Sequence, residues 1–81
     1  MITIFVNVQP KANILDPQGK TIQHALKNLG FQSIQEIRIG KRIKINIEVD
    51  NVKEATAKVQ EMCEKLLINP LIEEYSLEVV S

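Results

Sequence analysis

Residues 34–49 read IQEIRIGKRIKINIEV, and two apolar runs meet in this stretch at Gly40-Lys41. In the second run isoleucine or valine occupies every other position from 43 to 49, with Lys44, Asn46 and Glu48 between. Such alternation is typical of a strand with one buried face. The shorter first run has Ile34, Ile37 and Ile39. With a tight turn at Gly40-Lys41, the stretch predicts an antiparallel hairpin.

Residues 2–8 alternate in the same way and predict a strand that opens the chain. A helix should follow, because Asp16 is a good N-cap and Pro17 is favoured at the first helical position. Gly30 stands where a C-terminal cap belongs. The apolar stripe between these ends keeps the spacing of an amphipathic helix and consists of Ile22, Ala25, Leu26 and Leu29.

A second helix should follow the hairpin. Asp50 or Asn51 can cap it, and Glu54 stands in the capping-box position after Asn51. Asn69-Pro70 should end it, and residues 75–79 alternate again as a final strand. The apolar stripe of this helix is expected to be Val52, Ala55, Val59, Met62, Cys63 and Leu66.

The element order is therefore β-α-β-β-α-β, and residues 1–81 are expected to form a single domain. This order predicts an α+β, ferredoxin-like fold with a four-stranded antiparallel sheet and both helices on one face. The usual strand order of this fold, 4-1-3-2, puts the second and fourth strands on the edges. The other face of the sheet has no helix to cover it. We expect this uncovered face to carry Thr3, Phe5, Lys44, Asn46, Glu48, Ser76, Glu78 and Val80.

The composition excludes several classes of function. Ten basic and ten acidic side chains give a net charge of zero, so no electrostatic attraction to nucleic acid or anionic membranes is implied. One cysteine can form neither an internal disulfide nor a cysteine-based zinc site. With no basic leader and no run of about 20 apolar residues, we expect a cytoplasmic protein without a membrane partner.

No catalytic constellation emerges from the sequence, and we expect no catalytic, cofactor-binding or metal-binding residues. His24 is the only histidine and lies off the apolar stripe of its helix, so it should be a surface residue. Cys63 lies on an apolar stripe, where a thiol behaves as a small hydrophobic group. Glu61 and Glu64 have lysines nearby but no further metal ligand at a matching spacing.

The distribution of charge is more informative than its total. Basic residues cluster from Arg38 to Lys44, whereas Glu73, Glu74 and Glu78 cluster around the last strand. In the predicted sheet these two groups mark opposite edges, which either prevents aggregation or guides assembly. Ile14 and Leu15, which are apolar residues in a long loop, favour an interaction surface.

Three stretches, Ile14–Lys20, Arg38–Lys41 and Glu61–Glu73, resemble the PurS family. This family is the small subunit of phosphoribosylformylglycinamidine (FGAM) synthase, which makes an amidine from formylglycinamide ribonucleotide in purine biosynthesis, using ATP and glutamine. The resemblance runs essentially from end to end. It implies a non-catalytic adaptor that forms dimers and joins a glutaminase subunit of the PurQ type to a large synthetase subunit of the PurL type.

The resemblance further implies that ammonia passes between the two larger subunits with the help of this one. ATP and Mg²⁺ are expected in the synthetase subunit, and no cofactor is expected in this chain. Asp16, Pro17 and Gly40 each have a sufficient local role as a cap, a helix starter or a turn. The segments we expect at partner interfaces contain Leu15, Asp16, Pro17, Gln18, Gly19, Arg38, Gly40, Lys41 and Arg42.

Two other functions stay open at this point. Amino-acid-binding regulatory domains share the β-α-β-β-α-β topology, so a small-ligand sensor is the main alternative. RNA-recognition domains also share it and stack bases on aromatic residues of the central strands. Phe5 is placed for this role, but Lys44, Asn46 and Glu48 offer no second aromatic ring.

Overall fold

The computed structural model describes residues 1–80 and has an α+β architecture. The elements in the described residues are β1 (Ile2–Pro10), α1 (Pro17–Asn28), β2 (Lys41–Ile47), α2 (Val52–Met62), the π-helical turn η1 (Cys63–Leu67) and β3 (Glu73–Val79). Each predicted element is present except the strand expected at residues 34–39.

The sheet has three strands in the order β2-β1-β3, and β1 is antiparallel to both neighbours. Ile4 lies between Ile45 of β2 and Val79 of β3 on the face that is turned to the core. On the other face Phe5 lies between Lys44 and Glu78, as expected from the sequence. The predicted four-stranded sheet is therefore wrong for one copy of the chain.

The core lies between the sheet and α2, which packs on β1 and β3. The helix begins where predicted, because the Asn51 side chain accepts hydrogen bonds from the N–H groups of Lys53 and Glu54 at 2.8 and 3.3 Å. In β1 the side chains at positions 2, 4, 6 and 8 are buried, and the side chains at positions 3, 5 and 7 between them are half-buried. The buried core consists of Ile2, Ile4, Val6, Val8, Ala55, Val59 and Cys63.

At the end of α2 the backbone widens into the π-helical turn η1, and the Ile68 N–H donates to the Cys63 carbonyl at 3.1 Å. A π turn adds one residue to the repeat and rotates the side chains that follow. Cys63 stays in the core, whereas Leu66 is 83% exposed. The predicted stripe of this helix is therefore buried in its middle and exposed at Val52, Met62 and Leu66.

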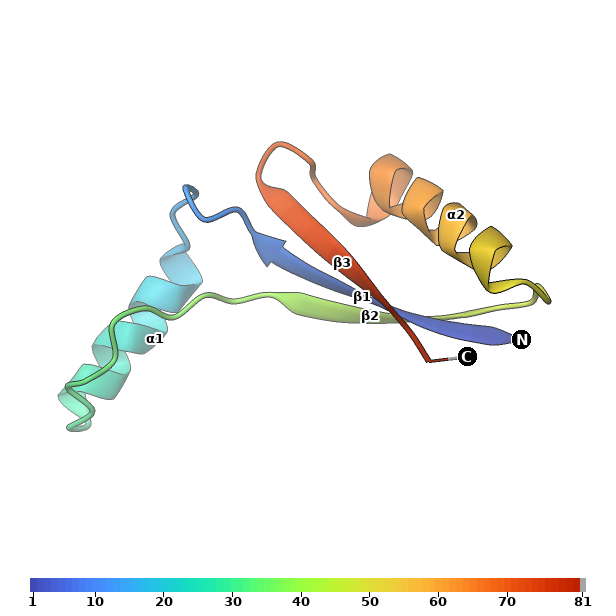
Figure 1. Cartoon of the computed structure of the whole chain (residues 1–81). Helices are drawn as coiled ribbons and strands as arrows, with labels where there is room; N and C mark the ends of the chain where they lie inside the picture. Colours follow the sequence, from blue (N-terminus) through green and yellow to red (C-terminus); the bar gives the residue numbers. More distant parts are fainter. Residues whose placement is uncertain (81) are drawn as a thin grey trace.

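The predicted hairpin around Gly40 does not form within the chain. Residues 31–40 are neither helix nor strand, and the backbone runs on from them into β2 without turning back (Figure 1). A strand needs a neighbouring strand to pair its N–H and C=O groups, and residues 34–39 are not hydrogen-bonded into the sheet. This segment thus has the alternating pattern of a strand, but it is not hydrogen-bonded to a neighbouring strand in the chain.

Helix α1 has the predicted ends. Pro17 stands in its first turn, Asp16 caps it, and Gly30 beyond its end has φ of 107°, which suits glycine. However, α1 does not lie on the sheet, so the prediction of two helices on one face is wrong for a single copy. It projects from the end of the sheet with residues 31–40 beside it (Figure 1).

We call residues 11–40 the arm and the remaining described residues the body. The arm makes the molecule long and thin, with extents of 50 × 25 × 14 Å. The radius of gyration is 16.2 Å, whereas a compact chain of this length has about 12 Å. One copy therefore leaves unusually much of its surface, including the arm, without packing partners.

Candidate functional site

The base of the arm is held by Asp16, one of the predicted interface residues. One carboxylate oxygen accepts the N–H of Gly19 at 2.9 Å, and the other accepts the N–H of Ile39 at 2.6 Å. The hydrogen bond from Ile39, followed by that from Gly19, holds the pKa of this carboxyl below its ordinary value. Asp16 therefore joins the start of α1 to the end of the extended segment.

Two glycines of the predicted segments allow close backbone contacts at this base. A Cβ at Gly19 would overlap the backbone carbonyl of Ile37, and a Cβ at Gly40 would press on the carbonyl of Val8. Gly19 thus lets the extended segment lie against α1, and Gly40 lets the arm leave the sheet beside β1. Both glycines have structural roles within one chain.

The predicted basic residues are also engaged within the chain. Arg38 donates to the backbone carbonyl of Lys11, so it ties together the two connections of the arm. Arg42 reaches across β1, forms an ion pair with Glu78 at 2.8 Å and covers the Phe5 ring, with its guanidinium carbon 3.8 Å from the ring centre. Lys41, Arg42 and Lys44 of the basic group lie on β2, and the acidic group lies on β3 at the opposite side of β1, whereas Arg38 lies in the arm.

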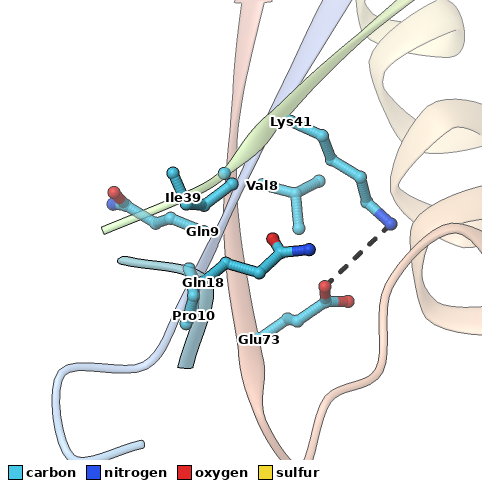
Figure 2. Close-up of a pocket in the computed structure, with 8 residues that line it drawn as sticks. Val8, Gln9, Pro10, Gln18, Ile39, Lys41 and Glu73 are labelled. Atoms are coloured by element: carbon cyan, nitrogen blue, oxygen red, sulfur yellow. Dashed lines mark ion pairs between the residues drawn. The ribbon is translucent and has the colours of Figure 1, made fainter. Parts of the chain in front are cut away.

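A cavity of about 250 Å³ lies at the joint between arm and body. Figure 2 shows Gln18 of α1 beside the ion pair of Lys41 and Glu73, whose charged atoms are 4.0 Å apart. Val8 and Ile39 form part of the apolar wall. The predicted residues Gln18, Gly40 and Lys41 therefore meet at one place, although they come from different segments.

The arm presents an apolar face that the rest of the described chain leaves largely uncovered. Ile22 and Leu29 of the predicted stripe are 41% and 74% exposed, and Leu26 is only half-buried. A groove beside Ile22 continues to Ile39 on the extended segment. An amphipathic helix normally buries such a stripe, so this face of α1 is incomplete in one copy.

The body presents a matching apolar groove. It lies between β2 and the end of α2, with a volume of about 590 Å³. Its floor includes Ile43 and Ile45, and one wall includes Met62, Leu66 and Leu67. Because α2 packs on β1 and β3, the apolar face of β2 at this groove has no helix over it. The outer edge of β2 is likewise unpaired.

The remaining predicted residues do not gather into a reaction centre. His24 is exposed on α1, and Cys63 is buried, where burial raises the pKa of its thiol. Among residues 1–80, no three His, Cys, Asp or Glu side chains are grouped as metal ligands. No helix in this part of the chain combines the length and the apolar character needed to cross a membrane.

Sequence reasoning missed the apolar groove of the body and named only the arm and its joint. Leu66 and Met62 were assigned to a buried stripe, and the π turn that exposes Leu66 has no signal in the sequence. The unpaired edge of β2 was missed for a related reason, since Ile34–Ile39 was expected to cover it. Leu15 is 70% exposed at the start of α1, and its contact with a partner stays a prediction.

The unpartnered faces of the arm and the body define a small α+β protein that assembles with other chains. The family model described as "PurS: Phosphoribosylformylglycinamidine (FGAM) synthase" matches residues 3–81. The chain therefore belongs to the PurS family, the small subunit of FGAM synthase. The resemblance inferred from the sequence is confirmed.

Relatives and solved structures agree with this assignment. The chain is 43% identical to the PurS subunit of Bacillus subtilis over 79 residues, which cover 98% of this chain and 93% of the relative. Its structure is similar to that of Bacillus subtilis PurS, with a TM-score of 0.89, 42% identity and full coverage of both chains. It is also similar to a chain of PurLQS from Thermotoga maritima, with a TM-score of 0.89, 33% identity and coverage of 98% and 96%.

Proposed function

We propose that this chain is the adaptor of FGAM synthase, joining a glutaminase subunit of the PurQ type to a synthetase subunit of the PurL type. The observation that carries the proposal is the pair of unpartnered apolar faces on a chain that is 50 Å long but only 14 Å thick. The similarity to a chain of the Thermotoga maritima PurLQS structure supports it. The chemistry itself belongs to the two larger subunits, and the ATP and Mg²⁺ are held by the synthetase.

An adaptor suits a reaction that consumes ammonia made at another active site. Ammonia is protonated and lost in water, so the two sites need a sheltered path between them. A small chain assists this transfer when it holds two larger proteins in a fixed relative position. We place the whole process in the cytoplasm, whose reducing conditions suit the free thiol of Cys63.

We further propose that two copies of the chain exchange arms and so complete the ferredoxin-like fold. In the order 4-1-3-2 the second strand lies beside the third, which is β2 here. The extended segment of one copy, with Ile34, Ile37 and Ile39, would pair with the open edge of β2 in the other. Its helix α1 would then cover the groove of the body. Each half would have four strands and two helices on one face.

The apolar residues on both sides support this exchange. The arm offers Ile22, Leu26 and Leu29, and the groove of the body offers a floor of isoleucines from β2. A straight backbone at Gly40 takes the place of the predicted turn, so that the two strands of the predicted hairpin come from different copies. Exchange of an identical element is a common route to symmetric dimers.

A small-ligand sensor is the second candidate function, and the cavity at the joint is the observation that favours it. Lys41, Glu73 and Gln18 offer a cation, an anion and an amide around about 250 Å³. We prefer the adaptor function because the larger apolar surfaces, on α1 and in the groove of the body, are not part of this cavity. Calorimetric titration of the isolated chain with amino acids and nucleotides separates the two readings, since only a sensor binds with saturation.

The adaptor is tested by measuring amidine formation by the two larger subunits with and without this chain. Glutamine and free ammonia serve in turn as the nitrogen source. We expect the glutamine-driven reaction to need the chain and the ammonia-driven reaction to proceed without it. Equal rates with and without the chain for both sources would contradict the adaptor.

The arm exchange is tested separately by sedimentation equilibrium. Ile22→Asp places a charge on the apolar face of α1, and we expect it to convert the dimer to a monomer at micromolar concentration. His24→Asp, on an exposed position of the same helix, is the matched control and should leave the dimer intact. A dimer that tolerates Ile22→Asp would overturn the exchange without affecting the adaptor.

A further inference from the structure

The extended segment of the arm, residues 34–39, turns alternate backbone groups toward its own helix. The Ile39 N–H donates to the carboxylate of Asp16 at 2.6 Å, and the Ile37 carbonyl lies so close to Gly19 that a Cβ there would overlap it. Both contacts are made at the start of α1. Neighbouring residues of an extended chain point their N–H and C=O groups to opposite sides. The even-numbered residues of the segment therefore point theirs away from α1.

The even-numbered residues of β2 likewise point their backbone groups to the open edge of the sheet. The Thr3 carbonyl accepts the Val80 N–H at 2.9 Å, so the odd-numbered residues of β1 are hydrogen-bonded toward β3 and its even-numbered residues toward β2. The partners of these even-numbered residues in β2 are odd-numbered, for example Ile43 opposite Val6. The N–H and C=O groups that β2 leaves for another strand therefore belong to its even-numbered residues.

The side chains lead to the same pairing rule. Ile39 lines the groove beside Ile22, on the apolar side of the arm, and Ile43 and Ile45 line the groove of the body. Residues directly opposite each other in an antiparallel pair point to the same face. If the arm of one copy covers the groove of another, the odd-numbered Ile39 must therefore stand opposite an odd-numbered residue of β2.

A tight hairpin within one chain breaks this rule. A two-residue turn at Gly40-Lys41 would place Ile39 opposite Arg42, an odd-numbered residue opposite an even-numbered one. Ile39 would then lie with Arg42 on the face that carries Phe5, which we call the outer face. A longer turn would restore the match, but the backbone runs straight from the arm into β2 (Figure 1). A straight chain satisfies the rule only with a second copy.

Two identical chains pair symmetrically when one residue lies opposite its own copy on a two-fold axis. With Gly40 on that axis, Ile37 stands opposite Ile43 toward the core. On the outer face Glu36 then stands opposite Lys44. Both of these side chains are exposed, and among residues 1–80 neither forms an ion pair. Opposite charges directly across a ladder are favourable, and the symmetry provides this pair twice in a dimer.

An axis at Lys41 satisfies the same rule but brings like charges together. It would pair more isoleucines, yet it would place the two Lys41 side chains opposite each other and Arg38 opposite Lys44. With the axis at Gly40, the like charges opposite each other are Arg38 and Arg42. Each of these is already hydrogen-bonded within its own chain. The charges therefore favour the axis at Gly40.

We propose that two copies of the chain pair antiparallel around a two-fold axis at Gly40, with Glu36 of each copy opposite Lys44 of the other. The occupant of the open edge of β2 is thus a second copy of this chain, held in a single register. This inference rests on the proposed arm exchange and supplies the residue pairs through which the exchange takes place.

The test combines Glu36→Cys with Lys44→Cys in the full-length chain. Mild oxidation should convert most of this variant to a covalent dimer on a non-reducing gel, because opposite Cα atoms about 5.5 Å apart lie within disulfide range. Within one straight chain the two positions are about 26 Å apart, too far for a bridge. Glu36→Cys with Asn46→Cys, one pair further along, is the matched control and should cross-link little. The native Cys63 is buried.

Exchange of the two charges gives a second readout without cysteines. Glu36→Lys and Lys44→Glu should each weaken the dimer about tenfold, since two ion pairs are lost and like charges meet. The double variant restores opposite charges, so its dimer should return toward the strength of the wild type. Sedimentation equilibrium of the four proteins is the measurement. Equal dimer strength in all four would overturn the register.

Three cross-linking results would also overturn the proposal. Efficient bridging of Glu36→Cys with Asn46→Cys, and not with Lys44→Cys, would move the axis to Lys41. A disulfide within one chain would show a closed hairpin. A dimer that neither cysteine pair bridges would show that the copies meet at another surface. A wild-type chain that sediments as a monomer would instead remove the arm exchange itself, and the adaptor function is decided separately by amidine formation.

Discussion

The carboxylate of Asp16 lies 2.6 Å from the backbone nitrogen of Ile39 and accepts its hydrogen bond. This contact joins the first residue before α1 to the last residues before β2. Since the other carboxylate oxygen caps α1, a single side chain holds both connections of the arm in register. The arm is therefore a fixed unit at its base, although its apolar face is unpaired.

Replacement of Asp16 by asparagine should destabilise the fold in a pH-dependent way. The amide has one acceptor oxygen in place of two, so one N–H at the base of the arm loses its partner. The folded-state pKa of Asp16 lies below its ordinary value, so the stability that its carboxylate contributes is present at neutral pH and is lost as pH falls through the folded pKa.

We therefore expect Asp16→Asn to lower the midpoint of urea unfolding at pH 7. The decrease should be smaller toward about pH 3, where an aspartyl group of ordinary pKa near 3.9 is largely protonated. Asp50→Asn, at an exposed aspartate outside the arm, is the control. Equal midpoints for wild type and Asp16→Asn at neutral pH would show that the contact with Ile39 contributes no stability.

Gly19→Ala should destabilise the protein, although alanine favours a helix. At an ordinary helical position this change stabilises by about 1 kcal/mol. Here the new methyl group would overlap the Ile37 carbonyl, which is backbone and cannot rotate away. Gln18→Ala, one residue earlier, is the matched control, and urea unfolding of both variants is the measurement. A Gly19→Ala variant as stable as its control would contradict the close approach.

Ile4→Ala should cost about 2–5 kcal/mol of unfolding free energy, the usual range for a fully buried aliphatic side chain. Ile4 has no exposed surface and lies in the middle strand between residues of β2 and β3. Val52→Ala, at a position 47% exposed, should change the free energy by no more than about 0.5 kcal/mol. Similar losses for the two variants would place the core elsewhere.

The ion pair of Arg42 and Glu78 should contribute only a small coupling energy to the free energy of unfolding. Both side chains are about half exposed, and exposed pairs contribute about 0.2–1 kcal/mol. A double-mutant cycle with Arg42→Ala and Glu78→Ala should give a coupling in this range that decreases with added salt. A coupling that is independent of salt would assign the effect of Arg42 to its packing on Phe5 instead.

The thiol of Cys63 should react with disulfide reagents only when the protein unfolds. The side chain is fully buried, and burial raises its pKa, so both access and the thiolate fraction are low in the folded state. Labelling rates measured across a urea titration should follow the unfolding curve. Rapid labelling of the native protein would show that α2 opens locally near η1.

The local elements were predictable because their signals are local. The Asn51 cap depends on residues next to it in sequence, and so does the proline start of α1. Alternation in β1 and β2 reports which face is buried, and the structure confirms both faces. The π turn at Cys63–Leu67 was not predictable, since its residues are ordinary helix formers.

The predicted hairpin was wrong because strand pairing does not follow from local signals alone. The alternation of residues 34–39 indicates a segment suited to a strand, but it carries no information on which copy of the chain supplies the neighbour. The same limit applies to the predicted interface residues. Asp16 and Arg38 were expected to contact partners, yet both are hydrogen-bonded within the arm.

The straight backbone at Gly40 also bears on how fast the proposed dimer forms and how fast it exchanges its subunits. In the proposed exchanged dimer each chain would complete its fold only on the other, so the final folding step would be a collision between two molecules and would slow as the chain is diluted. Separation requires both arms to be released together, and partners should therefore be replaced slowly. A newly made chain would pair with another newly made chain in preference to entering an older dimer, so each dimer would keep the two molecules with which it was formed.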